Sequence, residues 1–269
     1  MDMVVCVKQI IDPVTPASLL EIDMNGKRAQ PKNPKLVKLV VSDYDLNAVE
    51  AALKIRDANG GKITVISLGA KSAIEAIREC IAMGADEGFL LNDPFFDESN
   101  TYSTAYSLSK AIRKIGLFDL ILCGVQEGDW DAGQVGSGIA KFLGIPCITA
   151  VGKAEVKDNK RVAIERVVGE GRESVEVPTP ALLSVRSEIG APRYPTMKKQ
   201  MAAKKKEIPI WNAKDIAADE TKVGDSAVRI KLMKLAIPIH EAKCEFVKGQ
   251  TPEEAGSNLA LRLKEAKLI

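Results

Sequence analysis

The sequence predicts an α/β fold: a doubly wound, mostly parallel sheet with helices on both faces, followed by an antiparallel meander and an extended C-terminal arm. Through residue 150, short β-branched runs alternate with helical periodicity, which is typical of a parallel sheet covered by helices. From residue 151 to residue 185, apolar residues alternate with polar ones, as in antiparallel strands. After residue 186 no long periodic stretch occurs until a helix near the C-terminus.

The first elements can be placed in chain order. A strand is expected over residues 3–8, and a loop over residues 12–29 should end in a small hairpin at Asn25-Gly26. Ser42 is placed to cap a helix that Gly60-Gly61 would stop. The next expected elements are a strand over 63–68, a helix over 73–83, a strand over 88–91 and a helix over 101–115.

A glycine-rich stretch over residues 118–144 contains a buried strand, a turn and the start of a helix. Gly124 would end the strand, Asp129 or Asp131 is available as the helix cap, and Gly144 would stop the helix. A turn from a strand's carboxyl end to a helix's amino end suits phosphate or another anion. The spacing matches neither G-x-G-x-x-G nor a P-loop. Two interpretations therefore stay open: a nucleotide site, or glycines that serve only packing.

Three segments would lie at the carboxyl ends of neighbouring strands: residues 6–8, 67–70 and 124–136. In open α/β sheets, ligands bind at that edge, at the point where the strand order reverses. We therefore expect these segments to line one crevice.

The composition describes a globular protein, with 46% hydrophobic and 28% charged residues in a chain of 269. The formal net charge of +2 predicts no nucleic acid partner. Because no apolar run approaches about 20 residues, we expect no membrane insertion and a cytoplasmic location. The five cysteines are widely spaced, and the single histidine, His240, is expected at the surface or an interface. These residues predict no metal site and no catalytic side chain.

The C-terminal region has a different pattern. Turns at Asp158-Asn159 and at residues 169–171 predict a meander, and residues 181–185 predict one more buried strand. Residues 186–250 should be either disordered or covered by a partner, and a final helix capped at Thr251-Pro252 favours the partner. We divide the chain into an α/β domain, residues 1–186, and an arm, residues 187–269. The arm carries lysines that either face solvent or attract an acidic partner: Lys198, Lys199, Lys204, Lys205 and Lys206.

Several segments resemble the β subunit of electron transfer flavoproteins. Residues 191–211, APRYPTMKKQMAAKKKEIPIW, are similar to that family's P-R-Y-x-T…M-x-A-K-K-K segment. The opening VVCVKQI, the block SAIEAIRECIAMGADEG and the G-x-Q…D…Q-x-G turn match the same family in the same order. The resemblance covers essentially the whole chain, and it implies a Rossmann-like domain that binds an adenine nucleotide.

The resemblance also implies a heterodimer, in which an α subunit supplies most of the site for a redox-active FAD. This chain would bind an adenine nucleotide in the crevice, and the flavin would carry the chemistry. Matched by position, the nucleotide would contact Cys6, Ser42, Asp43, Tyr44, Asp45, Leu68, Gly124, Val125, Gln126, Asp129, Trp130, Gly133, Gln134, Val135 and Gly136. The partner-recognition residues would be Arg193, Tyr194, Met197, Lys204, Lys205 and Lys206, with Met197 as the apolar anchor that enters a dehydrogenase.

The nucleotide stays open between two branches of the family. One branch holds AMP in the crevice and takes electrons from flavin dehydrogenases of the acyl-CoA dehydrogenase type. The other holds a second FAD, takes a hydride from NADH and divides the electron pair between two acceptors, so that NAD would be a further ligand. Residues 99–105, SNTYSTA, which include Thr101 and Thr104, and GQVG at 133–136 resemble the second branch.

The sequence departs from the family pattern at two places. Pro13 stands where some relatives have an aromatic residue near the flavin, and EGDW at 127–130 replaces the usual A-I-D-[GD]. Trp130 would either pack at the α-subunit interface or stack on an adenine or flavin ring. A nucleotide-sensing module without a redox role is the alternative from a different functional class.

Overall fold

The computed structural model of this protein describes residues 1–23, 28–97, 99–158, 160–228, 230, 232–237 and 244–269. Asn25-Gly26, Asn159 and His240, where we expected two turns and a surface or interface histidine, lie outside these residues. Within the described ranges, no helix has the length and apolar composition needed to cross a bilayer.

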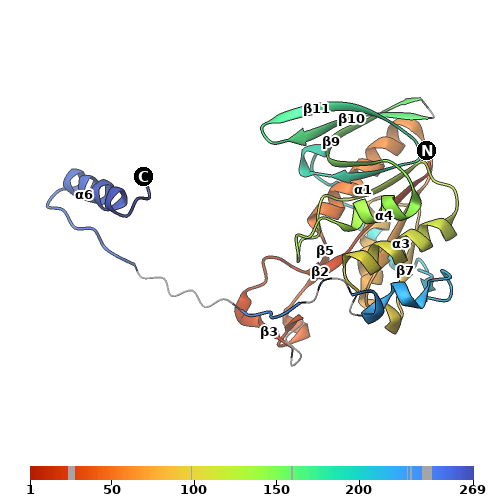
Figure 1. Ribbon diagram of the computed structural model, residues 1–269, viewed down its shortest axis with the longest axis horizontal. Coiled ribbons are helices and arrows are strands. Elements are labelled where there is room, and N and C mark those ends of the chain that lie inside the picture. The colour runs from red at the N-terminus through yellow and green to blue at the C-terminus, as the bar shows by residue number, and fades with distance from the viewer. Residues whose placement is uncertain (24–27, 98, 159, 229, 231, 238–243) are drawn as a thin grey trace.

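The main sheet has nine strands in the order β11-β10-β9-β12-β8-β1-β6-β7-β13 (Figure 1). Neighbours from β9 to β13 in this order run parallel, and β9, β10 and β11 form an antiparallel meander, so the predicted mixed sheet is confirmed. The strands are β1 (Met3–Cys6), β6 (Ile63–Leu68), β7 (Glu87–Leu91), β8 (Leu120–Gly124), β9 (Cys147–Asp158), β10 (Arg161–Val168), β11 (Gly171–Pro178), β12 (Ala181–Val185) and β13 (Ile210–Trp211).

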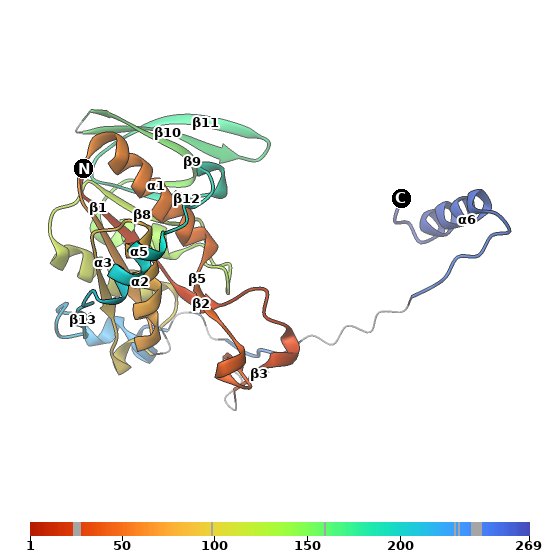
Figure 2. The same cartoon turned by 180° about the vertical axis from the view of Figure 1, so that it is seen from behind.

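Helices cover both faces of the sheet (Figure 2). The apolar side chains of α1 and α2 pack on one face, and those of α3 and α4 pack on the other, so each face has its own hydrophobic core. Burial of these two cores is the main force that holds the layers together. The helices of the body are α1 (Asp43–Asn59), α2 (Ile74–Met83), α3 (Thr101–Ile115), α4 (Val135–Leu143) and α5 (Met197–Lys204).

Local signals fix the ends of these helices. Asn100 and Ser103 form a reciprocal capping box at the start of α3, which therefore begins at the predicted residue. Gly60 ends α1 with a positive φ of 71°, which favours glycine, and its N–H donates to the carbonyl of Arg56. The predicted strands 63–68 and 181–185 match β6 and β12, and the strand expected within the glycine-rich stretch 118–144 begins at Leu120 and ends at Gly124.

The segment between β1 and α1 is more ordered than the expected loop. Strand β2 (Gln9–Ile11) pairs with β5 (Leu39–Val41), which places both beside the carboxyl end of β1. A second small ribbon joins β3 (Leu20–Ile22) and β4 (Ala29–Pro31), in the region where the hairpin was predicted.

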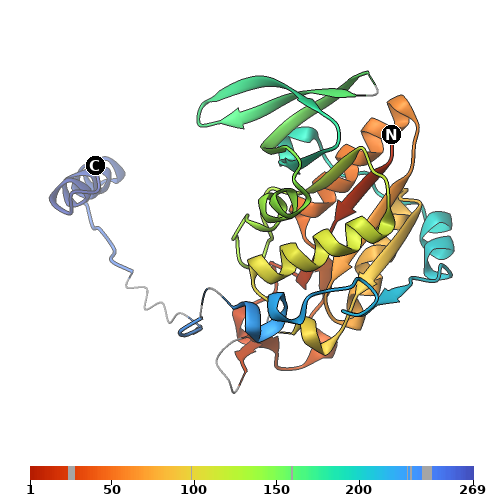
Figure 3. The same ribbon diagram turned by 45° about the vertical axis from the view of Figure 1, so that its right-hand side comes forward.

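The expectation that residues 186–250 are either disordered or covered by a partner is wrong for the first part of this segment. Helix α5 packs on α2, and β13 extends the sheet beside β7. Ile208, Ala213 and Ile216 are buried, and the Trp211 ring stacks on Phe89 with 4.2 Å between ring centroids. Figure 3 shows this segment, in blue, lying beside α3. The apolar residues were too scattered among lysines to predict this packing.

The last helix, α6 (Pro252–Glu265), stands apart from the α/β body (Figures 1 and 2). None of its residues is buried, and the exposed apolar side chains include Leu259 and Leu261. Propensity alone rarely stabilises a helix of this length in water, so its apolar positions are available to another surface.

Candidate functional site

Asp45 joins the ends of two central strands. Its carboxylate accepts one hydrogen bond from the Lys8 N–H at 2.8 Å, just beyond β1, and one from the Gly124 N–H at 3.0 Å, at the end of β8. After β1 the chain continues to β6 on one side, and after β8 it continues to β9 and β12 on the other side, so the strand order reverses between β1 and β8. The buried Asp45 side chain therefore links the start of α1 to the ends of β1 and β8, at the edge of the sheet where we expected the crevice.

Burial raises the pKa of the Asp45 carboxyl from its ordinary 3.8 to about 7. Loss of water is the largest cause, because it disfavours the charged form. The two backbone N–H groups favour the charged form and oppose this effect, and the positive charge of Lys8 does the same. The negative charge of Glu127 raises the pKa further.

This raised pKa predicts a pH dependence of stability. Between the ordinary value of 3.8 and about 7, the folded protein keeps a proton that the unfolded chain releases. The free energy of unfolding should therefore fall as pH rises through this window, with a slope of at most about 1.4 kcal/mol per pH unit. Asp45→Asn should remove this component in urea unfolding measured across the window, whereas the exposed Asp43→Asn should keep it. An unchanged pH profile for Asp45→Asn would contradict the assignment.

The turn between β8 and α4 is held by two contacts among its own residues and by an ion pair with Lys8, which follows β1. The Lys8 ammonium pairs with the Asp129 carboxylate at 2.8 Å, and the Gln126 amide donates to Asp131 at 2.8 Å. Glu127 accepts from the N–H of Gly133 at 3.2 Å. Asp131 and Gly133 both have a positive φ, 52° and 60°, which gives the turn its sharp reversal. The backbone of this turn is therefore already shaped in the chain alone.

The start of α4 lacks a side-chain cap. We had expected Asp129 or Asp131 to cap the helix, but neither does. The Asp129 carboxylate pairs with Lys8, and the Asp131 carboxylate accepts a hydrogen bond from Gln126. The N-cap residue is Gln134, whose side chain makes no capping hydrogen bond. The first N–H groups of a helix have no partner within the helix, so this end can receive an anion.

Helix α3 begins beside α4. The Thr101 hydroxyl lies 3.3 Å from the Gln134 amide oxygen, and a side chain at Gly138 would come within 2.6 Å of Ala105. The two helix starts are therefore packed closely together.

Two serine hydroxyls at this edge are buried and have no hydrogen-bond partner within the described structure: Ser42 Oγ, at the start of α1, and Ser67 Oγ, near the end of β6. A side chain at Gly128 would lie 3.6 Å from the Ser42 hydroxyl, so this serine sits directly under the turn. A buried hydroxyl without a partner indicates a polar group that the protein chain does not itself supply. Together with the uncapped α4, this hydroxyl fits a polar anionic ligand such as a nucleotide.

Comparison with known proteins identifies the family. The family model for the electron transfer flavoprotein domain matches residues 36–216. The chain belongs to the electron transfer flavoprotein family.

Relatives match along nearly the whole chain. An electron transfer flavoprotein subunit beta from Thermoanaerobacterium thermosaccharolyticum is 40% identical over 92% of this chain and 96% of its own length. One from Clostridium acetobutylicum is 35% identical over 100% of both chains. The caffeyl-CoA reductase-Etf complex subunit CarD of Acetobacterium woodii is 34% identical, also over 100% of both.

In this electron transfer flavoprotein chain, most of the residues expected at the nucleotide meet at one edge. Cys6, Ser42, Asp45 and Leu68 lie at the ends of β1, β5, α1 and β6, and the Tyr44 hydroxyl receives a hydrogen bond from Gln126 at 3.2 Å. Asp43, Val125 and Val135 are neighbours in sequence of Ser42, Gln126 and Gln134, and Thr104 lies on α3, three residues after Thr101. Trp130 is 53% exposed, so part of its surface is not covered by other residues of this chain.

Gly136, like Gly124, is closely surrounded by atoms of this chain. A side chain there would meet Cys123 Sγ at 2.6 Å and Leu182 at 3.3 Å, so Gly136 allows α4 to pack closely on the sheet. A larger residue at this position would disturb packing whether or not a nucleotide binds. Lys8 and Glu127 lie in the expected segments 6–8 and 124–136 but are absent from the individual contacts that the resemblance implies, and the structure places both side chains at the turn.

The expected partner-recognition residues divide into two groups. Tyr194 is 97% exposed and Met197 is 77% exposed, and Lys204 and Lys205 are also exposed, so all four can meet another protein. Arg193 and Lys206 instead contact this chain: Arg193 pairs with Glu50 and Asp57, and the Lys206 ammonium donates to the Asp86 carbonyl. Sequence alone could not reveal these internal partners, because they are more than 100 residues away along the chain.

Proposed function

We propose that this chain is the β subunit of a heterodimeric electron transfer flavoprotein, with an adenine nucleotide bound where β1 and β8 end. The observation that carries this proposal is the similarity to β subunits over nearly the full length of both chains. The buried serine hydroxyl, the uncapped α4 and the glycine turn support the position of the nucleotide. A nucleotide sensor without a redox role has no comparable support.

The residues of this chain would act by binding and orientation. The N–H groups at residues 134–136 and the Lys8 ammonium would face the phosphates, and Ser42 would hydrogen-bond to a polar group of the nucleotide. Asp45 would hold the two strand ends in register around the ligand. An FAD shared with the α subunit supplies the electron chemistry when bound. No side chain of this chain needs to act as a general acid or base.

We propose a flavin dehydrogenase of the acyl-CoA dehydrogenase type as the electron donor. One relative belongs by name to a caffeyl-CoA reductase complex, which supports a partner that acts on CoA thioesters. Residues 187–269 would form the contact region, with the exposed part of the segment around Met197 facing the dehydrogenase and α6 packing on the α subunit.

A second candidate is a component that binds a second FAD in this crevice and oxidises NADH. It rests on the likeness of residues 99–105 and 133–136 to that branch. The 3.3 Å contact between Thr101 and Gln134 places these two segments next to each other, as a shared ligand would require.

The basic test is the visible spectrum of this chain co-purified with its α subunit. We expect a flavin band near 450 nm (roughly, the position for a flavin whose electronics the protein tunes) that bleaches on addition of an acyl-CoA dehydrogenase and its substrate. A complex without flavin would contradict the proposal. A flavin that only NADH reduces would favour the second candidate.

Met197→Asp should weaken docking to the dehydrogenase. Met197 is 77% exposed, and a charge at an apolar anchor that becomes buried costs about 2 kcal/mol or more, so KM for the flavoprotein should rise about thirtyfold or more. Leu117→Asp, at a 97% exposed position between α3 and β8, is the matched control and should leave KM unchanged. Equal KM values for the Met197→Asp variant and the wild type would exclude Met197 as an anchor.

A further inference from the structure

The docking segment, defined here as residues 193–206, is fastened at its beginning by Arg193. The guanidinium donates to both carboxylate oxygens of Glu50, at 2.9 and 3.0 Å, and to Asp57 at 2.9 Å. The Arg193 N–H also donates to Glu50 at 3.1 Å. Only 4% of the Glu50 side chain is exposed, so this is a partly buried bidentate pair rather than a surface contact.

The end of the docking segment is fastened separately. The Lys206 ammonium donates to the carbonyl of Asp86, before β7, and Arg78 of α2 reaches the Lys206 carbonyl at 3.4 Å. Ala203 and Ile208 are buried, which anchors the last turn of α5 and the residues after it. The chain between the two ends therefore has little freedom to move away from α2.

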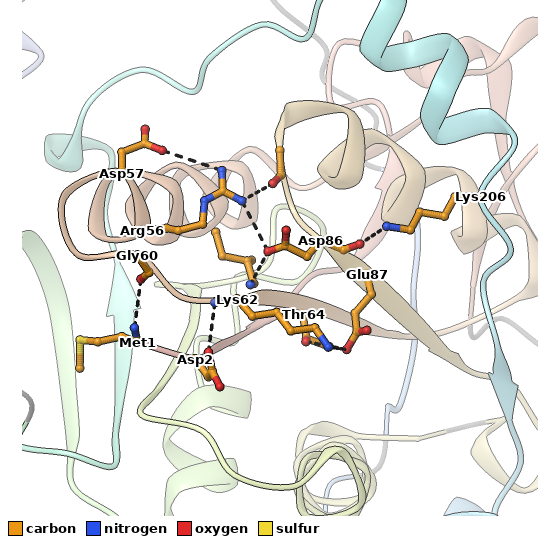
Figure 4. Close-up of polar contacts among 12 residues, drawn as sticks. Met1, Asp2, Arg56, Asp57, Gly60, Lys62, Thr64, Asp86, Glu87 and Lys206 are labelled. Atoms are coloured by element: carbon orange, nitrogen blue, oxygen red, sulfur yellow. Dashed lines mark hydrogen bonds and ion pairs between the residues drawn. The ribbon is translucent and has the colours of Figure 1, made fainter.

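The two fastenings belong to one polar network, part of which Figure 4 shows. Asp57, which pairs with Arg193, also lies 3.8 Å from the Arg56 guanidinium. Arg56 in turn contacts the Asp86 carboxylate at 3.5 Å, and the Asp86 carbonyl receives Lys206. The carboxylate of Asp86 also accepts the Ile63 N–H at 2.8 Å, which ties the network to the amino end of β6.

The side chains displayed between these ends point outward. Tyr194, Met197 and Met201 are 97%, 77% and 57% exposed, although large apolar side chains usually prefer burial. Met197 and Met201 are four residues apart on α5, so they share one face of that helix. A rigid frame thus carries three exposed side chains that this chain leaves uncovered.

We infer that the network of Arg193, Glu50, Asp57, Arg56, Asp86 and Lys206 holds the docking segment in its binding geometry before the dehydrogenase arrives. This inference rests on the proposed function of the segment as the docking surface. Arg193 and Lys206 are then positioning residues, which act through Tyr194 and Met197 without touching the partner. Holding a segment in its bound form strengthens binding because less ordering remains to be done on association.

The test uses the complete α–β complex and two readouts. Hydrogen exchange of residues 194–205 is measured without dehydrogenase, and steady-state electron transfer then gives KM and kcat. For Arg193→Met we expect exchange of these amides to be at least about tenfold faster. KM for the flavoprotein should rise about tenfold while kcat, set by the flavin site, stays nearly constant.

Three further variants complete the design. Arg193→Lys keeps the charge but not the bidentate geometry, so it should give an intermediate effect. Asp57→Asn removes the ion pair between Asp57 and Arg193 at a half-exposed position, and it replaces Arg193→Met in the test if that variant fails to fold. Arg161→Met breaks surface pairs with Asp158 and Glu176 in the meander and should change neither readout.

The outcomes separate the two proposals. Unchanged exchange in both Arg193→Met and Asp57→Asn would overturn the inference, even if the segment docks the dehydrogenase. Faster exchange with an unchanged KM would also overturn it, because the order of the segment would then be irrelevant to binding. If the wild-type complex accepts no electrons from any dehydrogenase, the proposed function fails, and the exchange data alone decide whether the network orders the segment.

Discussion

Gly124→Ala should remove the bound nucleotide and destabilise the protein. An added methyl group would lie 2.6 Å from Tyr44 Cβ, 2.7 Å from the Tyr44 carbonyl carbon and 2.8 Å from Asp45 Oδ1. Backbone atoms at these distances cannot move aside cheaply, so the end of β8 must separate from the start of α1. Overpacking of this kind costs about 1–3 kcal/mol of unfolding free energy. It would also disturb the hydrogen bond from the Gly124 N–H to Asp45, which joins the end of β8 to the start of α1.

The matched control for Gly124→Ala is Gly69→Ala at the same edge of the sheet. An added methyl at Gly69 would meet only Ala73 Cβ at 3.6 Å, which is an ordinary contact, and the backbone there needs no positive φ. Urea unfolding and quantification of nucleotide released from the heterodimer measure both effects. We expect nucleotide content to fall at least about tenfold in Gly124→Ala only, equivalent to about 1.4 kcal/mol of binding free energy or more. A Gly124→Ala protein with full nucleotide content would contradict this placement of the site.

Deleting residues 252–269 should separate the subunits without unfolding this chain. Helix α6 has no buried residue and stands apart from the α/β body, so the free energy of unfolding of the isolated chain should change by less than about 0.5 kcal/mol. Under the proposed arrangement, the exposed Leu259 and Leu261 pack on the α subunit, and their loss should weaken the heterodimer about a hundredfold or more.

Two point variants in the full-length chain test whether the apolar positions of α6, rather than the shortening of the chain, hold the heterodimer together. Leu259→Asp lowers the charge of α6 by one unit at an apolar position, and Lys264→Asp lowers it by two units at a polar position, so the control carries the larger change of charge. Analytical ultracentrifugation should show dissociation for Leu259→Asp and an intact heterodimer for Lys264→Asp. A truncated chain that still forms the heterodimer with wild-type affinity would show that α6 is not the contact.

The sequence predicted the regions in which one local signal dominates. Strand 63–68, helix 101–115 and strand 181–185 have strong apolar periodicity, a capping box or flanking breakers, and the structure has them at the predicted residues. The reversal of strand order could also be predicted, because it follows from the alternation of strands and helices, and it marks the edge at which we expect the nucleotide.

What could not be predicted depends on contacts between distant residues. Strand β13 has only two residues, and it forms because β7 offers an open edge and Phe89 offers a ring for Trp211 to stack on. The family resemblance places Arg193 at the partner surface, and nothing near it in the sequence reveals its pair with Glu50, 143 residues away. The local sequence favours Asp129 as the cap of α4, but its carboxylate instead pairs with Lys8, which is 121 residues away along the chain. The partners of these polar side chains are close in space but distant in the sequence, so local sequence patterns cannot predict them.

The most direct test of the nucleotide site is a count of the adenine-containing molecules released from the purified α–β complex by denaturation and chromatography. We expect two per heterodimer: the FAD shared with the α subunit, and a second molecule held at the ends of β1 and β8. AMP as the second molecule identifies the simple carrier, and a second FAD identifies the NADH-oxidising branch. Gly124→Ala should retain only the shared FAD. A wild-type heterodimer with one FAD and no other adenine nucleotide would contradict the assignment of a nucleotide site to this chain.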